Sequence, residues 1–499
     1  MSLDHPPSSN PPGGLAALEA RLAEDLSLLE LPAREWVLGK QHDGGEVLDV
    51  AVIGGGMAGL AAAAALKLLG VRARIFDRSP QGLEGPWATT ARMETLRSPK
   101  DLTGPCLGLP SLTFRAWYEA QFGTDAWQAL DKIPRVQWMD YLVWYRRVLG
   151  LEIESKTTVL AIRPATPADS VLEVILATPA GEERVLARHV VLATGRDGGG
   201  QPQVPAMAKK LNRQRWAHSA DEIDFAALRD KRVAVVGAGA SAMDNAATAL
   251  EAGAARLDMF IRRKDLPRIN KLTGVSSPGL AHGFALLPDA WKWRFNSYAM
   301  ATQTPPPRSS TLRVSRYEQA YFHLGSPVED VIEEGNELVV QTPHGRYALD
   351  FIIFATGFTT DLLVRPELAP VADNIRLWKD AFDASQEGPN RELANSPYLG
   401  SAFECQEKVE GSCPAVGRIH LFNYSAVASQ GKLSGDIPAV SIGAERLAQG
   451  IVARMFCDDC DEHYAALQAY AKPELFGDEW TDADEEQRSL DVTPQAKAS

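Results

Sequence analysis

A glycine turn between a strand and an Ala-rich helix is the feature that most constrains the fold of this chain. Gly54, Gly56 and Gly59 have G-x-G-x-x-G spacing directly after the apolar run 48–53. A helical pattern and a second apolar run, residues 71–76, complete a strand–helix–strand unit. A turn of this kind lets the backbone approach a pyrophosphate group at the N-terminus of a helix. The sequence predicts a dinucleotide-binding fold here.

The residue that follows the second strand supports this interpretation. Asp77 stands about twenty residues beyond the turn, where a carboxylate accepts hydrogen bonds from ribose hydroxyls. Both the turn and its acidic partner are present, so we expect Asp77 to bind the ribose of a dinucleotide.

The same pattern occurs a second time. An apolar run, residues 232–236, leads into a second glycine turn and an Ala-rich helix, and the strand 257–261 follows. The second turn consists of Gly237, Gly239, Ser241 and Ala242, with Ala in the third position. We therefore expect a second dinucleotide-binding unit.

The second unit differs from the first at the end of its second strand. Arg262 and Arg263 stand there in place of a carboxylate. A 2′-phosphate needs cations where a free 2′-hydroxyl needs an acceptor, and arginine matches phosphate oxygens with a planar fork. This site is predicted to prefer NADPH to NADH.

Two further strands end in the tripeptide Ala-Thr-Gly. The first contains Thr194 and Gly195, and the second contains Thr356 and Gly357. Small residues at these points let the chain pass closely behind a bound dinucleotide. Together with the glycine turns, they predict an α/β fold with two Rossmann-like domains, the second inserted into the first.

Composition narrows the classes of partner. The chain has 499 residues and a formal net charge of -13, which argues against nucleic acid and anionic membranes. The longest apolar run, residues 58–69, is shorter than the roughly twenty residues of a membrane span. No cationic leader precedes an apolar stretch, so we expect a cytoplasmic protein. The single C-x-x-C pair, Cys457 and Cys460, receives no role, and no metal site is predicted.

The order of these motifs resembles a known family. Residues 47–455 are similar to the flavoproteins with two dinucleotide-binding domains, and in detail to the class B flavin-dependent monooxygenases. The narrower resemblance rests on Gly85-Pro86-Trp87, on His218-Ser219, and on Ser241 and Asp244 in the second unit. Later residues resemble the ornithine and lysine N-hydroxylases, namely Asp350, Asn423, Gln430-Gly431 and Arg446.

The resemblance implies FAD and NADPH as cofactors, and a small organic molecule and O2 as substrates. In this family NADPH reduces the flavin, and one oxygen atom of O2 reaches the substrate through a C4a-(hydro)peroxyflavin. The protein then supplies a dry pocket and oriented hydrogen bonds. Transfer to nitrogen or sulfur is favoured. Neither substrate identity nor oligomeric state can be read from the sequence.

Three residues are predicted in the reactive neighbourhood. Trp87 is expected beside the flavin, and Arg97 is expected to hold the charge of the peroxide or nicotinamide. His218 lies in the linker to the NADPH unit. Arg97 stands where heteroatom-oxidising members of the family carry Asn.

Alternative functions remain at this stage. Baeyer–Villiger oxidation of a ketone uses the same folds, although the Trp-Pro that ends the fingerprint of those enzymes is missing. A non-oxygenating NADPH–flavin oxidoreductase or a redox sensor also fits two nucleotide sites. A disulfide reductase needs a cysteine pair facing the flavin, and no pair stands at the expected positions.

The predicted domain organisation follows from these motifs. Residues 15–37 have the spacing of an amphipathic helix. The predicted segments are an N-terminal helical extension (1–46), the first part of the FAD-binding domain (47–205), the NADPH-binding domain (206–330), the second part of the FAD-binding domain (331–470) and a flexible acidic tail (471–499).

Overall fold

The computed structural model describes residues 13–166, 170–484 and 487. The chain divides into two compact units, Met1–Ala453 and Arg454–Ser499. No helix within the described residues has both the length and the apolar character needed to cross a membrane.

The first sheet carries the first glycine turn at the carboxyl end of its central strand β2. The strand order is β4-β3-β2-β7-β6-β5, with β1 paired to β2 and β18 paired to β7. The pairs β2–β3, β3–β4, β2–β7 and β18–β7 are parallel, whereas β5–β6, β6–β7 and β1–β2 are antiparallel. The strands are β1 (Lys40–His42), β2 (Gly45–Ile53), β3 (Ala73–Phe76), β4 (Ile153–Glu154), β5 (Thr158–Pro164), β6 (Leu172–Thr178), β7 (Gly181–Leu192) and β18 (Ile419–His420).

The helix after the first turn is α2 (Met57–Leu68), whose residues from Met57 to Leu66 are all buried. A helix that is apolar on every side is stable only inside the protein, which explains its Ala-rich sequence. The predicted strand–turn–helix–strand unit is thus confirmed, with β3 beginning two residues later than expected.

The second sheet is parallel throughout and repeats the arrangement. Its order is β12-β11-β10-β16-β9, with the second glycine turn following β10. The strands are β9 (Trp216–His218), β10 (Arg232–Val236), β11 (Arg256–Ile261), β12 (Ala320–Leu324) and β16 (Phe351–Phe354). The helix α5 (Ala240–Glu251) follows the turn.

The strand β16 corrects one part of the predicted domain organisation. Residues 351–354 were assigned to the FAD-binding domain, yet they pair with β10 from Val233↔Phe351 to Val236↔Phe354. The apolar strand completes the buried centre of the second sheet, which therefore extends beyond residue 330. Both dinucleotide folds lie within one compact unit, so the other boundaries stay predictions.

Two smaller sheets accompany the second fold. The strands β13 (Asp330–Glu334), β14 (Glu337–Thr342) and β15 (Gly345–Leu349) form an antiparallel sheet, and its apolar face packs against Phe260, Ile352 and Phe354. The strands β8 (Gly200–Pro202) and β17 (Phe358–Thr360) form a two-stranded antiparallel connection. Each of these two strands follows one of the Ala-Thr-Gly ends.

The described residues also form further α-helices. They are α1 (Gly14–Leu28), α3 (Phe114–Ala129), α4 (Arg135–Val148), α6 (Pro278–Gly283), α7 (Asp289–Thr302), α8 (Arg308–Ser315), α9 (Trp378–Ala381), α10 (Arg391–Ala394), α11 (Val427–Gln430), α12 (Val440–Asp458) and α13 (Cys460–Ala469). Residues 470–484 contain no helix or strand, and the rest of the predicted tail lies outside the described residues apart from residue 487.

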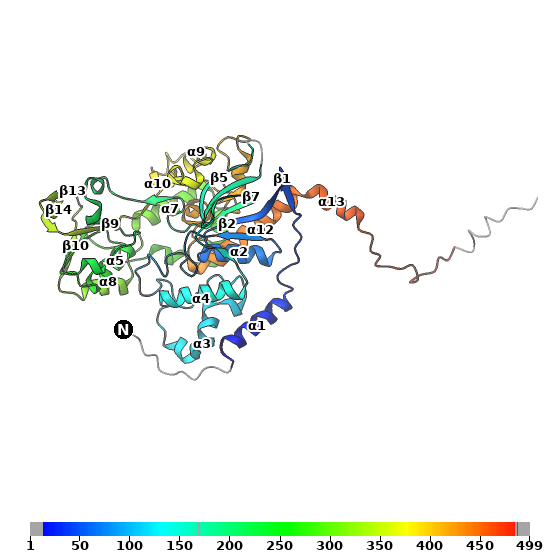
Figure 1. The fold of residues 1–499 in the computed structure, drawn as a ribbon, viewed down its shortest axis with the longest axis horizontal. Helices are drawn as coiled ribbons and strands as arrows, with labels where there is room; N and C mark the ends of the chain where they lie inside the picture. The colour runs from blue at the N-terminus through cyan, green and yellow to red at the C-terminus, as the bar shows by residue number, and fades with distance from the viewer. Residues whose placement is uncertain (1–12, 167–169, 485–486, 488–499) are drawn as a thin grey trace, which may run out of the picture. The chain divides into compact units, whose positions relative to one another are not determined.

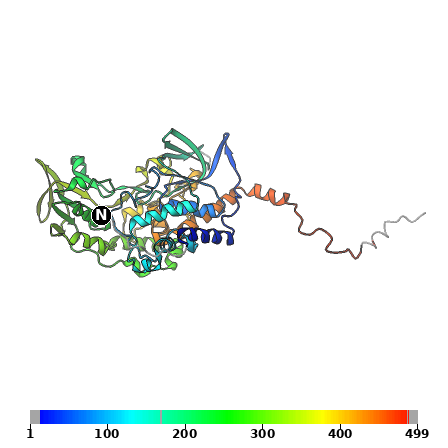
Figure 2. The ribbon, with the colours of Figure 1, turned by 60° about the horizontal axis from the view of Figure 1, so that its bottom comes forward.

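The N-terminal helix α1 is shorter than predicted. It ends at Leu28 and not near residue 37, because Pro32 lacks the N–H group that helix continuation requires. Both ribbon views show α1 in dark blue beside the cyan helices α3 and α4 (Figures 1 and 2). The Trp144 indole and the Arg147 guanidinium both donate to the Glu19 carboxylate, which attaches α1 to α4.

Candidate functional site

The first glycine turn is shaped by two very close backbone approaches. Gly54 has φ +105°, and a Cβ added there would lie 2.6 Å from the carbonyl oxygen of Ala193. A Cβ on Gly59 would overlap the carbonyl oxygen of Gly54. Gly56 has only Gly85 nearby, with its Cα 3.5 Å from the same hypothetical atom. The turn brings β2 and α2 together while leaving room above its middle glycine for a phosphate.

Asp77 is fixed beside this turn. Its carboxylate is buried, accepting from the N–H of Gly55 at 2.6 Å and from the N–H of Ser79 at 2.7 Å. Glu84, which accepts from Arg146 at 3.1 Å, lines a small cavity next to Gly55 and Gly56. The turn and the acidic strand end fit a dinucleotide lying across the N-terminus of α2.

Trp87 lies on the aromatic core under the turn. Its indole ring meets the buried Trp138 edge-on, with ring centroids 6.4 Å apart, and its carbonyl accepts from Arg135. The position of Cδ1 is 4.0 Å from a Cβ built on Gly85, which itself adjoins Gly56. The structure thus brings Trp87 close to the glycine turn and packs it against Trp138, and its predicted place beside the flavin stays a prediction.

Arg97 lies within electrostatic range of the Asp436 carboxylate, which comes from a distant part of the chain. Its surroundings remove hydration from the guanidinium and so lower the pKa of Arg97, and the charge of Asp436 opposes this shift. Burial raises the pKa of the Asp436 carboxyl, opposed by Lys432 and Arg97. The sequence analysis did not name Asp436, since it belongs to no recognisable motif and lies 339 positions further along the chain.

The second glycine turn has the same geometry with more space. Gly237 has φ +140°, and a Cβ there would lie 2.5 Å from the carbonyl oxygen of Ala355. Nothing lies within 4 Å of a Cβ built on Gly239. Ala242 is fully buried in the first turn of α5, whereas Ser241 is exposed. A second phosphate can therefore approach the N-terminus of α5.

The two arginines after β11 differ in their contacts. Arg263 donates to the carbonyl of Ala301 at 2.9 Å. Arg262 is exposed, and the described residues offer its guanidinium neither a hydrogen bond nor an ion pair. Arg262 is the better placed of the two to bind a phosphate group.

The first Ala-Thr-Gly end is held by a buried amide. Asn423 donates to the carbonyl of Leu192 at 3.3 Å and to the hydroxyl of Thr194 at 3.2 Å. Its own oxygen accepts from the N–H and hydroxyl groups of Ser425. The carbonyl of Gly195 accepts from the N–H of Tyr424. Sequence resemblance found Asn423, but its contact with Thr194 required the structure.

The second Ala-Thr-Gly end adjoins the two-stranded connection. The Thr356 hydroxyl donates to the carbonyl of Gln203, and Gly357 has φ +84° with open space at its Cβ position. Because β8 and β17 pair with each other, the chain leaves both strand ends at the same connection.

His218 is buried at the end of β9, next to this connection. Its Nδ1 accepts from the N–H of Ala220 at 3.2 Å, and its ring lies edge-on to Phe358 at 5.7 Å. Burial lowers the pKa of His218, while Asp221 and the Gly357 backbone oppose the shift. The imidazole is therefore neutral at pH 7.

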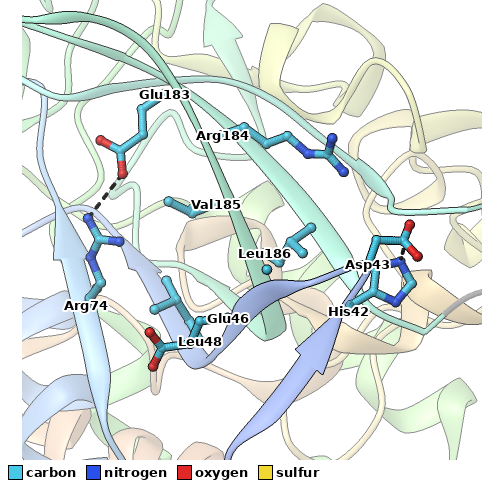
Figure 3. Close-up of a pocket in the computed structure, with 10 residues that line it drawn as sticks. His42, Asp43, Glu46, Leu48, Arg74, Glu183, Arg184, Val185 and Leu186 are labelled. Atoms are coloured by element: carbon cyan, nitrogen blue, oxygen red, sulfur yellow. Dashed lines mark hydrogen bonds and ion pairs between the residues drawn. The ribbon is translucent and has the colours of Figure 1, made fainter.

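A separate hollow of about 450 Å³ lies at the amino-terminal end of β2, away from the glycine turn. Figure 3 shows His42 and Asp43 on one side and the Arg74–Glu183 pair, 3.5 Å apart, on the other. Dinucleotides bind at the carboxyl ends of parallel strands, so this hollow is not the cofactor site.

Comparison with known proteins agrees with this geometry. The family model of L-lysine 6-monooxygenase/L-ornithine 5-monooxygenase matches residues 126–302, and a FAD-NAD(P)-binding model matches residues 51–197. A FAD-dependent urate hydroxylase from Xanthomonas campestris pv. campestris is 41% identical over 466 residues, covering 93% of this chain and 98% of that protein. The chain belongs to the flavin-dependent monooxygenase family.

Solved structures share the fold of this flavin monooxygenase. Ornithine hydroxylase from Pseudomonas aeruginosa is 18% identical with a TM-score of 0.64, covering 82% of this chain and 100% of that one. L-lysine 6-monooxygenase from Pseudomonas syringae gives the same identity and TM-score, covering 82% of this chain and 99% of that one. The predicted fold class is confirmed. The flavin monooxygenase is an oxidoreductase with FAD and NAD(P) as its cofactors.

Proposed function

We propose that this flavin monooxygenase hydroxylates urate, or an oxopurine of the same electron-rich type, with NADPH and O2. The observation that carries the proposal is the 41% identity to a urate hydroxylase along almost the whole of both chains. Identity of that extent includes the strands, turns and loops that together form an active site. Urate therefore comes before any other substrate as a candidate.

We propose that FAD lies on the first fold. The turn Gly54, Gly56 and Gly59 would hold the pyrophosphate at the N-terminus of α2, and the Asp77 carboxylate would accept from ribose hydroxyls. Thr194 and Gly195 would pass behind the cofactor on the neighbouring strand. Bound FAD, once reduced by NADPH, supplies the activated oxygen.

We assign NADPH to the second fold. Gly237, Gly239, Ser241 and Ala242 would surround its pyrophosphate at the N-terminus of α5, and Thr356-Gly357 would border it. Arg262 would bind the 2′-phosphate with its uncommitted guanidinium, assisted by Arg263.

Three residues would shape the reactive neighbourhood. Trp87 would exclude water from one side of the flavin by packing on Trp138. Arg97 would stabilise negative charge close to the flavin through its positively charged guanidinium. Buried, neutral His218 would hold the connection between the two folds.

The oxygen acceptor distinguishes this proposal from its alternatives. The sequence favoured a nitrogen or sulfur acceptor, whereas hydroxylation of urate places oxygen on a ring carbon. The matching family model of lysine and ornithine monooxygenases makes amino-acid N-hydroxylation the second candidate. Baeyer–Villiger oxidation and non-oxygenating NADPH oxidation stay as further alternatives.

The test is substrate-dependent turnover of the purified FAD-loaded enzyme. Urate, lysine, ornithine and a small ketone are each incubated with NADPH under ¹⁸O2, and mass spectrometry follows label in the product. We expect urate to be consumed in proportion to NADPH, with one labelled oxygen in the product. Label in hydroxylated lysine or ornithine alone would replace urate with the second candidate. Hydrogen peroxide as the only oxygen product would favour the non-oxygenating reading.

A further inference from the structure

Arg196 directly follows the first Ala-Thr-Gly strand end. Its guanidinium carbon lies over the Tyr424 ring, 3.4 Å from the centroid, and 5.8 Å from the centroid of Phe358. The N–H of Tyr424 donates to the carbonyl of Gly195, which fixes the ring beside the strand end. Stacking of this kind is attractive and orients the planar guanidinium.

The charged edge of Arg196 has no partner among the described residues. Its guanidinium makes no hydrogen bond and no ion pair there, although the side chain is held by the Tyr424 ring. A guanidinium carries five N–H donors in its plane, and stacking occupies only its face. Arg196 therefore presents an oriented set of unused donors.

Glu392, on the short helix α10, lies within electrostatic range of Arg196. Its carboxylate is half-buried, and it too makes no hydrogen bond or ion pair within the part of the chain that the structure describes. Burial raises the pKa of Glu392, and the charge of Arg196 opposes the shift. The charges of Arg196 and Glu392 thus interact, although their nitrogen and oxygen atoms are more than 4.0 Å apart and form no direct ion pair.

The location of this pair links the two dinucleotide folds. Arg196 follows the end of β7 in the first sheet, whereas Phe358 follows the end of β16 in the second. His218, on the second sheet, packs edge-on against Phe358. Ligands of parallel α/β sheets bind at the carboxyl ends of the strands, and both sets of ends meet here.

We propose that Arg196 and Glu392 form the recognition pair for a planar, anionic oxopurine. Arg196 donates to the anionic nitrogen and carbonyl edge of the ring, and Glu392 accepts from a ring N–H. The rings of Tyr424 and Phe358 both lie near the Arg196 guanidinium, and aromatic neighbours favour a flat ligand. This inference rests on the proposed function and deepens it by assigning residues to substrate selection. An alkylammonium substrate would be repelled by Arg196.

The test measures binding of urate to the FAD-loaded enzyme by titration calorimetry, without turnover. Arg196→Gln is expected to raise the Kd for urate at least tenfold, since loss of a charged hydrogen bond costs about 1.5–3 kcal/mol. Arg196→Lys retains the charge without the planar fork and is expected to recover part of the affinity. Glu392→Gln is expected to raise Kd by a smaller factor, because the amide oxygen still accepts from a ring N–H.

Arg376→Gln is the matched control, because the Arg376 guanidinium likewise lies over a tyrosine ring, 5.5 Å from the centroid of Tyr398. Its urate affinity should equal that of the wild type. FAD content, thermal stability and the rate of flavin reduction by NADPH should be unchanged in all four variants. Lower FAD content or stability in Arg196→Gln, with normal urate binding by Arg196→Lys, would overturn the inference in favour of a structural role.

The two proposals fail in distinguishable ways. Unchanged urate affinity in Arg196→Gln, or an equal loss in Arg376→Gln, would overturn the recognition pair and leave urate hydroxylation standing. Urate binding that depends on Arg196 but produces no labelled product would support the pair and overturn the proposed function. Failure of wild-type enzyme to bind either urate or xanthine would overturn both.

Discussion

The two dinucleotide folds of this flavin monooxygenase share a strand–turn–helix plan but differ in how tightly it is closed. In the first fold Gly59 permits contact between α2 and the glycine turn that no side chain could tolerate. In the second fold Ala242 takes the corresponding place, and its Cβ lies 3.4 Å from a Cβ built on Gly237. The residue at the third position of the glycine turn therefore reflects how closely the helix packs against the turn.

The ends of the second strands differ in the same sense, with the second fold again the more open. Asp77 in the first fold is locked by two backbone N–H groups, whereas Arg262 in the second has no partner in the described residues. A locked carboxylate suits a cofactor that stays bound, and an open cation suits one that enters and leaves. This contrast gives four predictions, ordered by expected size.

Substitution of the residue at the third position of the glycine turn should reduce stability more in the first fold than in the second. Gly59→Ala places a methyl group against the backbone of Gly54, which has no room to move, and should cost more than about 4 kcal/mol. We expect loss of bound FAD and a lower Tm. Ala242→Gly in the second fold should cost only about 1 kcal/mol. Calorimetry and flavin content measure both. Similar losses of stability in the two variants would contradict the proposal that helix and turn pack more tightly in the first fold.

Acid should weaken the first sheet before the second. His420 on β18 bonds to His189 at 2.9 Å, and burial lowers the pKa of His420 from 6.5 to about 4, to which Arg418 also contributes. A folded-state pKa below the unfolded value contributes stability above pH 6.5, and that stability is lost as pH falls towards 4. The full shift corresponds to about 3 kcal/mol.

Hydrogen exchange at pH 7 and near pH 5 tests this order. After correction for the slower intrinsic exchange at lower pH, we expect the protection factors to fall in β7 and β18 and to change little in β10 and β11. His420→Asn should reduce the pH dependence, whereas His344→Gln, at an exposed turn, should not. An equal fall of the protection factors in both sheets would contradict the prediction.

Asp77→Asn tests whether the locked carboxylate at the first strand end is needed to bind FAD. The amide turns an N–H group towards a backbone donor, so one of the two hydrogen bonds is lost, at about 1–3 kcal/mol. We expect FAD affinity to fall by about tenfold to a hundredfold, measured by flavin release on dilution. Asp265→Asn, a mostly exposed carboxylate just after β11, is the control and should bind FAD normally.

Arg262→Gln should give the smallest and most selective effect. Loss of the 2′-phosphate contact should raise the KM for NADPH about tenfold and leave the KM for NADH unchanged. Arg263→Gln should have a weaker effect, because Arg263 is already bonded to the Ala301 carbonyl. Steady-state kinetics with NADPH and with NADH measures both KM values. An equal rise in the two values would show that Arg262 does not bind the 2′-phosphate.

Most of the fold was predictable because its signals are local. The glycine turns, the buried Ala-rich helices and their flanking strands follow from residues within about thirty positions of one another. The prediction failed for α1, which Pro32 ends early, and for β16, whose pairing partner lies 118 residues earlier. A short apolar strand carries no information about which of two sheets it joins, so packing decides.

The candidate site divides in the same way. The sequence alone determined the strand–turn–helix units, the carboxylate after one and the arginines after the other, because backbone geometry fixes the residues that a phosphate-binding turn accepts. Only the tertiary structure placed Arg97 with Asp436, and Arg196 with Tyr424 and Glu392. Those groups come from distant segments, and their proximity depends on how the connections fold over the strand ends, which no local spacing encodes.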